Sequence, residues 1–182
     1  MKKLCVLFPG IGYHCDKPLL YYCARLARAR GYEVRPLRFD GFPTGAKGND
    51  EKMRQAALHA LSQSEEQLSA VDFSEYGRVV FIGKSIGTYA ALAVNSRLGA
   101  NACGVLLTPL ALTFEQNASG FIALHGTADP WADTKEIRRL CDERGVPLFT
   151  YDNADHSLET GDTFSDIKNL SDIVEKCGKI IL

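Results

Sequence analysis

The feature that most constrains the fold of this chain is a regular alternation between short apolar runs and helix-length segments. The runs are nearly continuous in apolar residues, as is typical of strands that are covered on both faces. The segments between them repeat apolar residues three and four positions apart, which predicts amphipathic helices. The pattern predicts strands over 4–8, 34–39, 79–82, 104–108, 121–125 and 148–151, and helices over 16–30, 50–70, 86–98, 132–144 and 163–177. We therefore expect an α/β fold, a three-layer αβα sandwich around a mainly parallel sheet of about six strands.

Length and composition indicate an ordinary globular domain. The chain has 182 residues, of which 46% are hydrophobic and 24% charged, and we expect residues 1–182 to form one domain. Residues 41–48 are rich in glycine and proline and predict a loop. Residues 109–120 are the least patterned stretch.

Charge and hydropathy exclude several classes of partner. The net charge is −1, so nothing favours nucleic acid or an anionic membrane surface. No apolar run approaches the roughly 20 residues of a membrane span, and the start of the chain lacks the core of a signal peptide. The six cysteines include no CxxC pair, and we interpret them as reduced thiols in a cytoplasmic protein. Cys15 follows the loop after the first predicted strand. It could react with electrophiles if its pKa were lowered there.

The GKSIG stretch at 83–87 lies between a predicted strand and a predicted helix and has three interpretations. A phosphate loop would need glycine at position 78, where the chain has Arg78, and a loop where 79–82 predicts a strand. A dinucleotide fingerprint that begins at Gly10 fails in the same way, because Cys15 stands at its third glycine position. The remaining interpretations are a plain glycine turn and a nucleophile elbow, in which Ser85 projects from the sheet edge.

The elbow interpretation requires a base and an acid, because a serine hydroxyl is a weak nucleophile by itself. Among the four histidines, His156 directly follows the sixth predicted strand, and Asp129 follows the fifth. Ser85, Asp129 and His156 therefore all come at the carboxyl edge of a parallel sheet, where open α/β folds place their sites. We expect these three residues to form a catalytic triad.

Other residues near these positions have simpler interpretations. The alternative acids are Asp133, Asp152 and Asp155, and the last is adjacent to His156, which makes a hydrogen bond between their side chains awkward. We expect His125 to be structural. Lys84 is expected to be solvated or locally paired.

The motif, its partners and their chain order resemble the α/β-hydrolases, specifically the small lidless kind grouped with dienelactone hydrolases and minimal carboxylesterases. The resemblance covers essentially the whole chain and implies a minimal α/β-hydrolase fold with no cap domain, with the predicted strands in the spatial order 2-1-3-4-5-6. It also implies an oxyanion hole made by the backbone N–H groups of Ile11 and Ile86, with Gly12 as the alternative donor. Pro9 stands where the family has histidine.

The resemblance implies a serine hydrolase that cleaves a small carboxylic ester or thioester through an acyl-enzyme intermediate. Neither a cofactor nor a metal is expected, and the partner would be a small-molecule acyl substrate; the oligomeric state stays open. The connection over 109–120 is too short for a cap, so we expect an open cleft. The expected cleft residues are Gly12, Tyr13, His14 and Trp131. The alternative is a catalytically silent binding or scaffold protein of the same fold.

Overall fold

The computed structural model describes residues 1–46 and 48–182 of the chain. Within these residues six strands form one sheet in the order β2-β1-β3-β4-β5-β6, and every neighbouring pair is parallel. The strands are β1 (Lys2–Phe8), β2 (Glu33–Pro36), β3 (Tyr76–Lys84), β4 (Cys103–Leu107), β5 (Phe121–Gly126) and β6 (Leu148–Tyr151). The parallel sheet and the strand order that we expected are confirmed.

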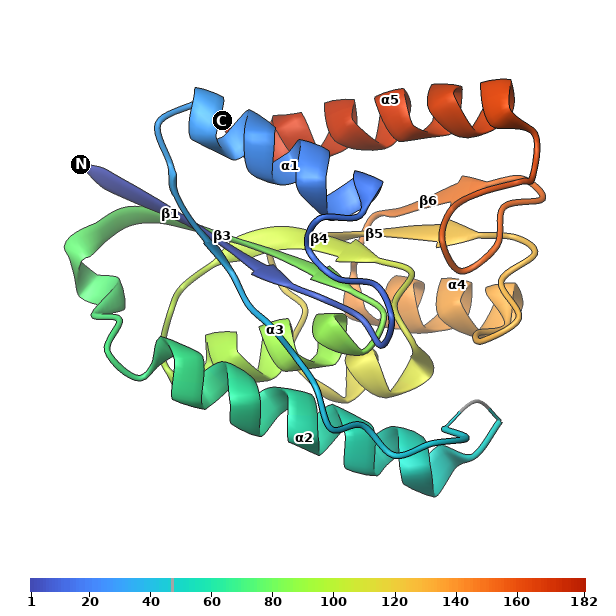
Figure 1. Ribbon diagram of the computed structural model, residues 1–182, viewed down its shortest axis with the longest axis horizontal. Helices are drawn as coiled ribbons and strands as arrows, with labels where there is room; N and C mark the ends of the chain where they lie inside the picture. Colours follow the sequence, from blue (N-terminus) through green and yellow to red (C-terminus); the bar gives the residue numbers. More distant parts are fainter. Residues whose placement is uncertain (47) are drawn as a thin grey trace.

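Five helices cover the two faces of this sheet, as Figure 1 shows. On one face lie α1 (Pro18–Ala29) and α5 (Thr163–Ile180). On the other lie α2 (Asp50–Leu68), α3 (Ile86–Arg97) and α4 (Thr134–Arg144). Two 3-10 turns, η1 (Phe73–Glu75) and η2 (Ala111–Glu115), complete the regular structure of the described residues. The three-layer αβα sandwich is confirmed, and each helix and strand ends within a few residues of its expected boundary.

The strand β2 is shorter than the sequence predicts, since it ends at Pro36 rather than at residue 39. Beyond Leu37, the backbone N–H of Arg38 donates to Gln67 Oε1 (3.0 Å) and that of Asp40 donates to Gln63 Oε1 (3.1 Å). Both glutamines lie on α2, so the chain leaves the sheet edge and follows this helix. Lys47, which belongs to the predicted loop over 41–48, lies outside the described residues.

Several helices begin where the sequence supplies a capping group. Asn49, Asp133 and Asp162 each accept a hydrogen bond from a backbone N–H in the first turn of α2, α4 and α5. The helix α1 begins instead with Pro18, whose missing N–H costs nothing at that position. These local signals explain why the helix starts could be predicted closely.

The helix α3 is an internal helix, and its burial fixes the turn before it. Every residue from Ile86 to Val94 is buried. One side of α3 lies on the sheet, and α2 covers the other with the small residues Ala56, Ala57 and Ala60. A helix that is apolar all round is expected to be buried in this way.

The strand β3 and the helix α3 approach so closely that only glycine fits at their junction. A Cβ on Gly83 would lie 2.7 Å from Gly87 O. A Cβ on Gly87 would lie 2.3 Å from Phe8 O and 2.4 Å from Pro9 O, at the end of β1. The two glycines therefore bring the ends of β1 and β3 and the start of α3 into direct backbone contact.

The connection between β4 and β5 carries no inserted domain. It contains only the single short turn η2 between Thr108 and Phe121. This agrees with the expected absence of a cap.

No described helix is both long enough and apolar enough to cross a membrane.

The junction generates a stability prediction. Gly87→Ala should lower the free energy of unfolding by about 2–4 kcal/mol, because the new methyl group would clash with backbone atoms that cannot rotate away. Gly178→Ala is the matched control, because Gly178 is also helical but the nearest atom to its added Cβ is Leu26 Cδ2 at 3.2 Å, the free end of a side chain. There the gain in helix propensity of about 1 kcal/mol opposes a mild contact. Urea denaturation measures both; equal losses would contradict the close packing at Gly87.

Candidate active site

Ser85 lies at the sharp turn between β3 and α3 in a conformation that is rare for a residue with a side chain. Its φ is 55° and its ψ is −123°, a strained combination. Its N–H donates to Leu107 O (2.9 Å), and its carbonyl accepts from Thr88 N–H (2.9 Å) and from the Thr88 hydroxyl (2.6 Å). The backbone of Ser85 is thus held from β4 and from α3, and the geometry is that of a nucleophile elbow.

The structure brings His156 and Asp129 to this serine. His156 Nε2 lies 2.7 Å from Ser85 Oγ, and His156 Nδ1 lies 2.7 Å from Asp129 Oδ2. An ionised carboxylate can only accept, so Nδ1 carries the hydrogen and Nε2 accepts from the serine hydroxyl. The second oxygen of Asp129 accepts from Trp131 N–H (2.8 Å). The three residues form one continuous chain of hydrogen bonds.

Contacts between two loops set this geometry. The loop after β5 carries Asp129, and the loop after β6 carries His156. Ala128 N–H donates to Ala154 O (2.9 Å), and Asn153 N–H donates to the Thr127 hydroxyl (2.8 Å). A Cβ on Gly126 would lie 2.3 Å from Ala154 O, so the loops meet without an intervening side chain.

Two of the three alternative acids, Asp155 and Asp133, have other partners. Asp155 Oδ1 accepts from Ser157 N–H (2.7 Å) and from Glu159 N–H (3.2 Å), which closes a turn in the loop that carries His156. Asp133 caps α4 by accepting from Glu136 N–H (2.9 Å). Asp129 is therefore the carboxylate that bonds to His156.

Burial and the hydrogen bond between Asp129 and His156 act in opposite directions on the pKa of each residue. Burial opposes ionisation of Asp129, but the hydrogen bond and charge of His156 outweigh it, and the pKa of Asp129 lies below its usual 3.8. For His156, burial lowers the pKa below its usual 6.5; the hydrogen bond to Asp129 opposes this shift and the charge of Lys84 adds to it. His156 is thus neutral near pH 7 and Asp129 is ionised, the protonation states that a base and its acid partner need.

The loop after β1 lies directly against the serine. Gly10 N–H donates to Tyr13 O (3.0 Å) and Tyr13 N–H donates to Gly10 O (3.2 Å), with Gly12 at the corner at a φ of 69°. A Cβ on Gly10 would lie 3.1 Å from Ser85 Cβ. The tight turn over 10–13 therefore borders Ser85.

The N–H groups expected to form an oxyanion hole come from this turn and from the first residue of α3. Within residues 1–46 and 48–182, the N–H groups of Ile11, Gly12 and Ile86 have no hydrogen-bond acceptor. The first N–H groups of a helix have no acceptor within that helix. Because Ile86 is the first residue of α3, its N–H is free to donate to a ligand. These donors remain the predicted oxyanion hole.

The expected cleft residues separate into different environments. Gly12 and His14 are exposed and border a cavity of about 360 Å³ beside the 10–13 turn. Trp131 stacks on His156, with ring centroids 5.3 Å apart and planes 23° apart. Tyr13 is buried in the core under α1, where its hydroxyl accepts from Leu19 N–H (3.2 Å). Tyr13 also borders a separate cavity of about 320 Å³ together with Ser157 and Leu158, which follow His156, and its place in a substrate cleft stays a prediction.

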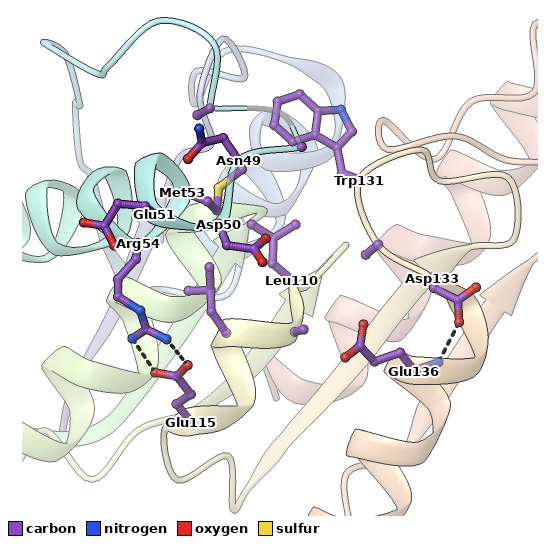
Figure 2. A pocket seen from close by; sticks show the side chains of 15 residues that line it. Asn49, Asp50, Glu51, Met53, Arg54, Leu110, Glu115, Trp131, Asp133 and Glu136 are labelled. Carbon is purple, nitrogen blue, oxygen red and sulfur yellow. Dashed lines mark hydrogen bonds and ion pairs between the residues drawn. The ribbon is translucent and has the colours of Figure 1, made fainter.

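Trp131 joins the histidine to a larger cavity of about 440 Å³ (Figure 2). The cavity lies between the starts of α2 and α4 and is also bordered by Leu110 and by Leu112 of η2. Figure 2 shows the ion pair between Arg54 and Glu115 at one side of it. Trp131 therefore contacts both the His156 ring and this cavity.

Two buried polar residues were not assigned a place in the site from the sequence. Lys84 is 1% exposed, so the expectation of a solvated lysine is wrong, while local pairing is correct, because its Nζ donates to the Thr108 hydroxyl (2.6 Å). His125 is fully buried; its Nε2 lies 3.0 Å from the Thr134 hydroxyl, and its Nδ1 lies 3.8 Å from Asp129 Oδ2. Strand alternation could have indicated the burial of Lys84, since it shares a face with Val80 and Ile82.

The described residues include no cluster of three or more side chains suited to a metal ion. All six cysteines are free. Burial raises the pKa of the Cys15 thiol to about 12, so it is not activated as a nucleophile in this structure.

Comparisons with known proteins show the fold. No protein-family model and no curated protein matches the chain. The chain is similar to an alpha-beta serine hydrolase homologue from Coxiella burnetii, with a TM-score of 0.66 and 16% identity over 96% of this chain and 84% of that one. A Pyrococcus furiosus esterase gives a TM-score of 0.66 and 15% identity over 100% and 84%. A serine hydrolase without a lid from Xanthomonas campestris gives 0.60 and 15% over 98% and 80%. The α/β-hydrolase fold without a lid, implied by the sequence resemblance, is confirmed.

The buried His125 and the half-buried His156 generate a prediction for stability against pH. Burial lowers the pKa of both His125 and His156. The unfolded chain takes up these protons near pH 6.5, before the folded chain does, so stability is present above pH 6.5 and falls as the pH drops through the folded pKa values. Urea denaturation at pH 7.5 and pH 5 should show the loss, and His125→Gln should reduce it. His59→Gln, at an exposed histidine, is the control. Stability that rises toward pH 5 would contradict the burial argument.

Proposed function

We propose that this protein is a serine hydrolase that cleaves a small carboxylic ester or thioester through an acyl-enzyme intermediate. The observation that carries the proposal is the unbroken chain of hydrogen bonds from Ser85 through His156 to Asp129, with 2.7 Å at each step. The strained turn at Ser85 adds support. Further support comes from similar solved structures that are described as serine hydrolases and esterases.

In the acylation step, Ser85 Oγ forms a bond to the substrate carbonyl carbon while its proton moves to His156 Nε2. The carbonyl electron pair moves onto oxygen, and the N–H groups of Ile11 and Ile86 donate to this oxyanion. When the tetrahedral intermediate collapses, the bond to the alcohol or thiol breaks. His156 returns its proton to that leaving group, and the acyl group stays on Ser85.

In the deacylation step, water replaces the leaving group and repeats the sequence. His156 takes a proton from water as the oxygen attacks the acyl carbon, and it then gives the proton to Ser85 Oγ as the acid departs. Asp129 keeps its negative charge throughout. It holds the imidazole with Nδ1 protonated and stabilises the imidazolium that forms in each step.

The absence of a lid supports a small substrate. Trp131 and η2 border one side of the site, and no inserted helices lie between β4 and β5 to enclose a long chain. Each methylene removed from water would contribute only about 0.8 kcal/mol. An open cleft leaves most of a long acyl chain in solvent, so long chains gain little.

The first test of the proposal is labelling with a fluorophosphonate probe, which should modify Ser85 and should fail on Ser85→Ala together with ester turnover. Asp129→Asn should lower kcat/KM by about 10³–10⁴-fold, because the amide supports the wrong histidine tautomer.

Asp155→Asn is the matched control for Asp129→Asn. It makes the same change one residue from His156, and its amide oxygen can still accept from Ser157 and Glu159, so activity should stay near that of the unmodified chain. Labelling that persists in Ser85→Ala would rule out this nucleophile. A folded protein that neither labels nor turns over a panel of acyl esters would favour the catalytically silent binding protein instead.

The second test concerns substrate size. With p-nitrophenyl esters of increasing acyl length, kcat/KM should be highest for short chains and should not rise when the substrate forms a lipid interface. Trp131→Ala should change this preference more than Phe164→Ala, because Trp131 contacts His156 whereas Phe164 is exposed on α5. A steady climb in efficiency through long chains would contradict the small-substrate proposal.

A further inference from the structure

Lys84 is a buried cation placed directly before the nucleophile. It is the last residue of β3, and its side chain points to the sheet face covered by α1 and α5, as do Val80 and Ile82. Lysine is almost never fully buried unless it is paired. Its burial at the end of a central strand therefore needs a reason beyond packing.

The surroundings of Lys84 fit an ammonium group. Its Nζ donates to the Thr108 hydroxyl at 2.6 Å and lies 5.0 Å from the centre of the Tyr13 ring. The hydroxyl accepts a hydrogen bond, and the ring face attracts a cation. The backbone agrees with this placement, because Thr108 directly follows Leu107, the β4 residue that pairs with Lys84.

The charged groups around Lys84 belong to the proposed triad and to the loops that hold it. Asp129 and Asp155 favour the charged form of Lys84, while burial and Lys17 oppose it. The groups that face His156 are Asp129, Asp155 and Lys84, and His125 faces Asp129 from the other side. The buried Lys84 is the residue directly before Ser85, whose hydroxyl lies 2.7 Å from His156 Nε2.

The positive charge of Lys84 lowers the pKa of His156. It makes a second positive charge less favourable, so the imidazole holds its proton less tightly. From this geometry, we infer that Lys84 keeps His156 in its neutral, proton-accepting form and so extends the activity of the enzyme toward lower pH. The inference rests on the proposed function for its effect on activity, but not for its effect on the histidine.

Lys84 carries its charge in the pH range in which His156 titrates. Burial lowers the pKa of Lys84 to about 7, and the pKa of His156 lies below 6.5. Lys84 is therefore still protonated in the pH range in which His156 takes up its proton. A purely structural lysine would support the same packing without any effect on the histidine pKa.

The test replaces Lys84 by methionine, which has similar length and no charge. A buried cation can often be replaced by an apolar side chain without loss of stability, and thermal unfolding monitors this. The pKa of His156 is measured by NMR titration of the imidazole nitrogens, with the signals assigned from their absence in His156→Gln. Lys84→Met should raise the pKa of His156 by about one unit, which is about tenfold in proton affinity.

Lys17→Met is the matched control. Lys17 also lies over the Tyr13 ring, at 5.3 Å, but it is only partly buried, so solvent screens its charge. It should leave the pKa of His156 nearly unchanged. Thr108→Val removes the acceptor of Lys84 while keeping a β-branched side chain, and it should shift the pKa of His156 in the same direction as Lys84→Met.

The activity profile completes the test. The acid limb of kcat/KM should move to higher pH in Lys84→Met by the same amount as the NMR pKa, with each profile normalised to its own plateau. An unchanged histidine pKa in a folded Lys84→Met protein would overturn the inference and leave the proposed function intact. Loss of labelling and turnover in the unmodified chain would overturn the proposed function, while the NMR titration would still decide the coupling.

Discussion

The structure depends on one steric constraint, the backbone contact where the ends of β1 and β3 meet the start of α3. Gly83 and Gly87 leave no space for a side chain there. The contact holds Ser85 at positive φ, a strain of about 1–3 kcal/mol that the buried helix α3 and the surrounding core sustain. Because β1 ends against α3, the same contact sets the 10–13 turn beside the serine. The positions of Ser85 and of the N–H groups next to it are consequences of one packing arrangement.

The second constraint is electrostatic, since the site gathers ionisable groups where little water reaches them. Asp129 has two hydrogen bonds, His156 has two, and Lys84 has one together with an aromatic face. These partners replace the solvation that each group loses on burial. His125 differs, because its Nδ1 is buried and has no hydrogen-bond partner among the described residues, with Asp129 Oδ2 at 3.8 Å. The balance of these groups holds the imidazole neutral and the carboxylate ionised.

The sequence predicted the three residues that the structure joins by hydrogen bonds, because each one directly follows a strand. In a parallel sheet all such positions meet at one edge, so their proximity follows from topology. The same reasoning did not indicate that the ring of Tyr13, which follows β1, packs in the core, since position after a strand does not determine side-chain direction. It also failed to place Lys84 inside the molecule, although the alternation along β3 contained that information.

What the sequence determined by itself was the class of fold, the strand order implied by its resemblance and the set of residues at the carboxyl edge. These follow from periodicity, glycine positions and chain order, which are local properties. Only the tertiary structure decided which carboxylate bonds to His156, which N–H groups remain without an acceptor and which charges are buried together. Those outcomes depend on how loops from different strands contact one another, as where Ala128 meets Ala154. Such contacts join residues far apart in the chain, and no local sequence pattern predicts them.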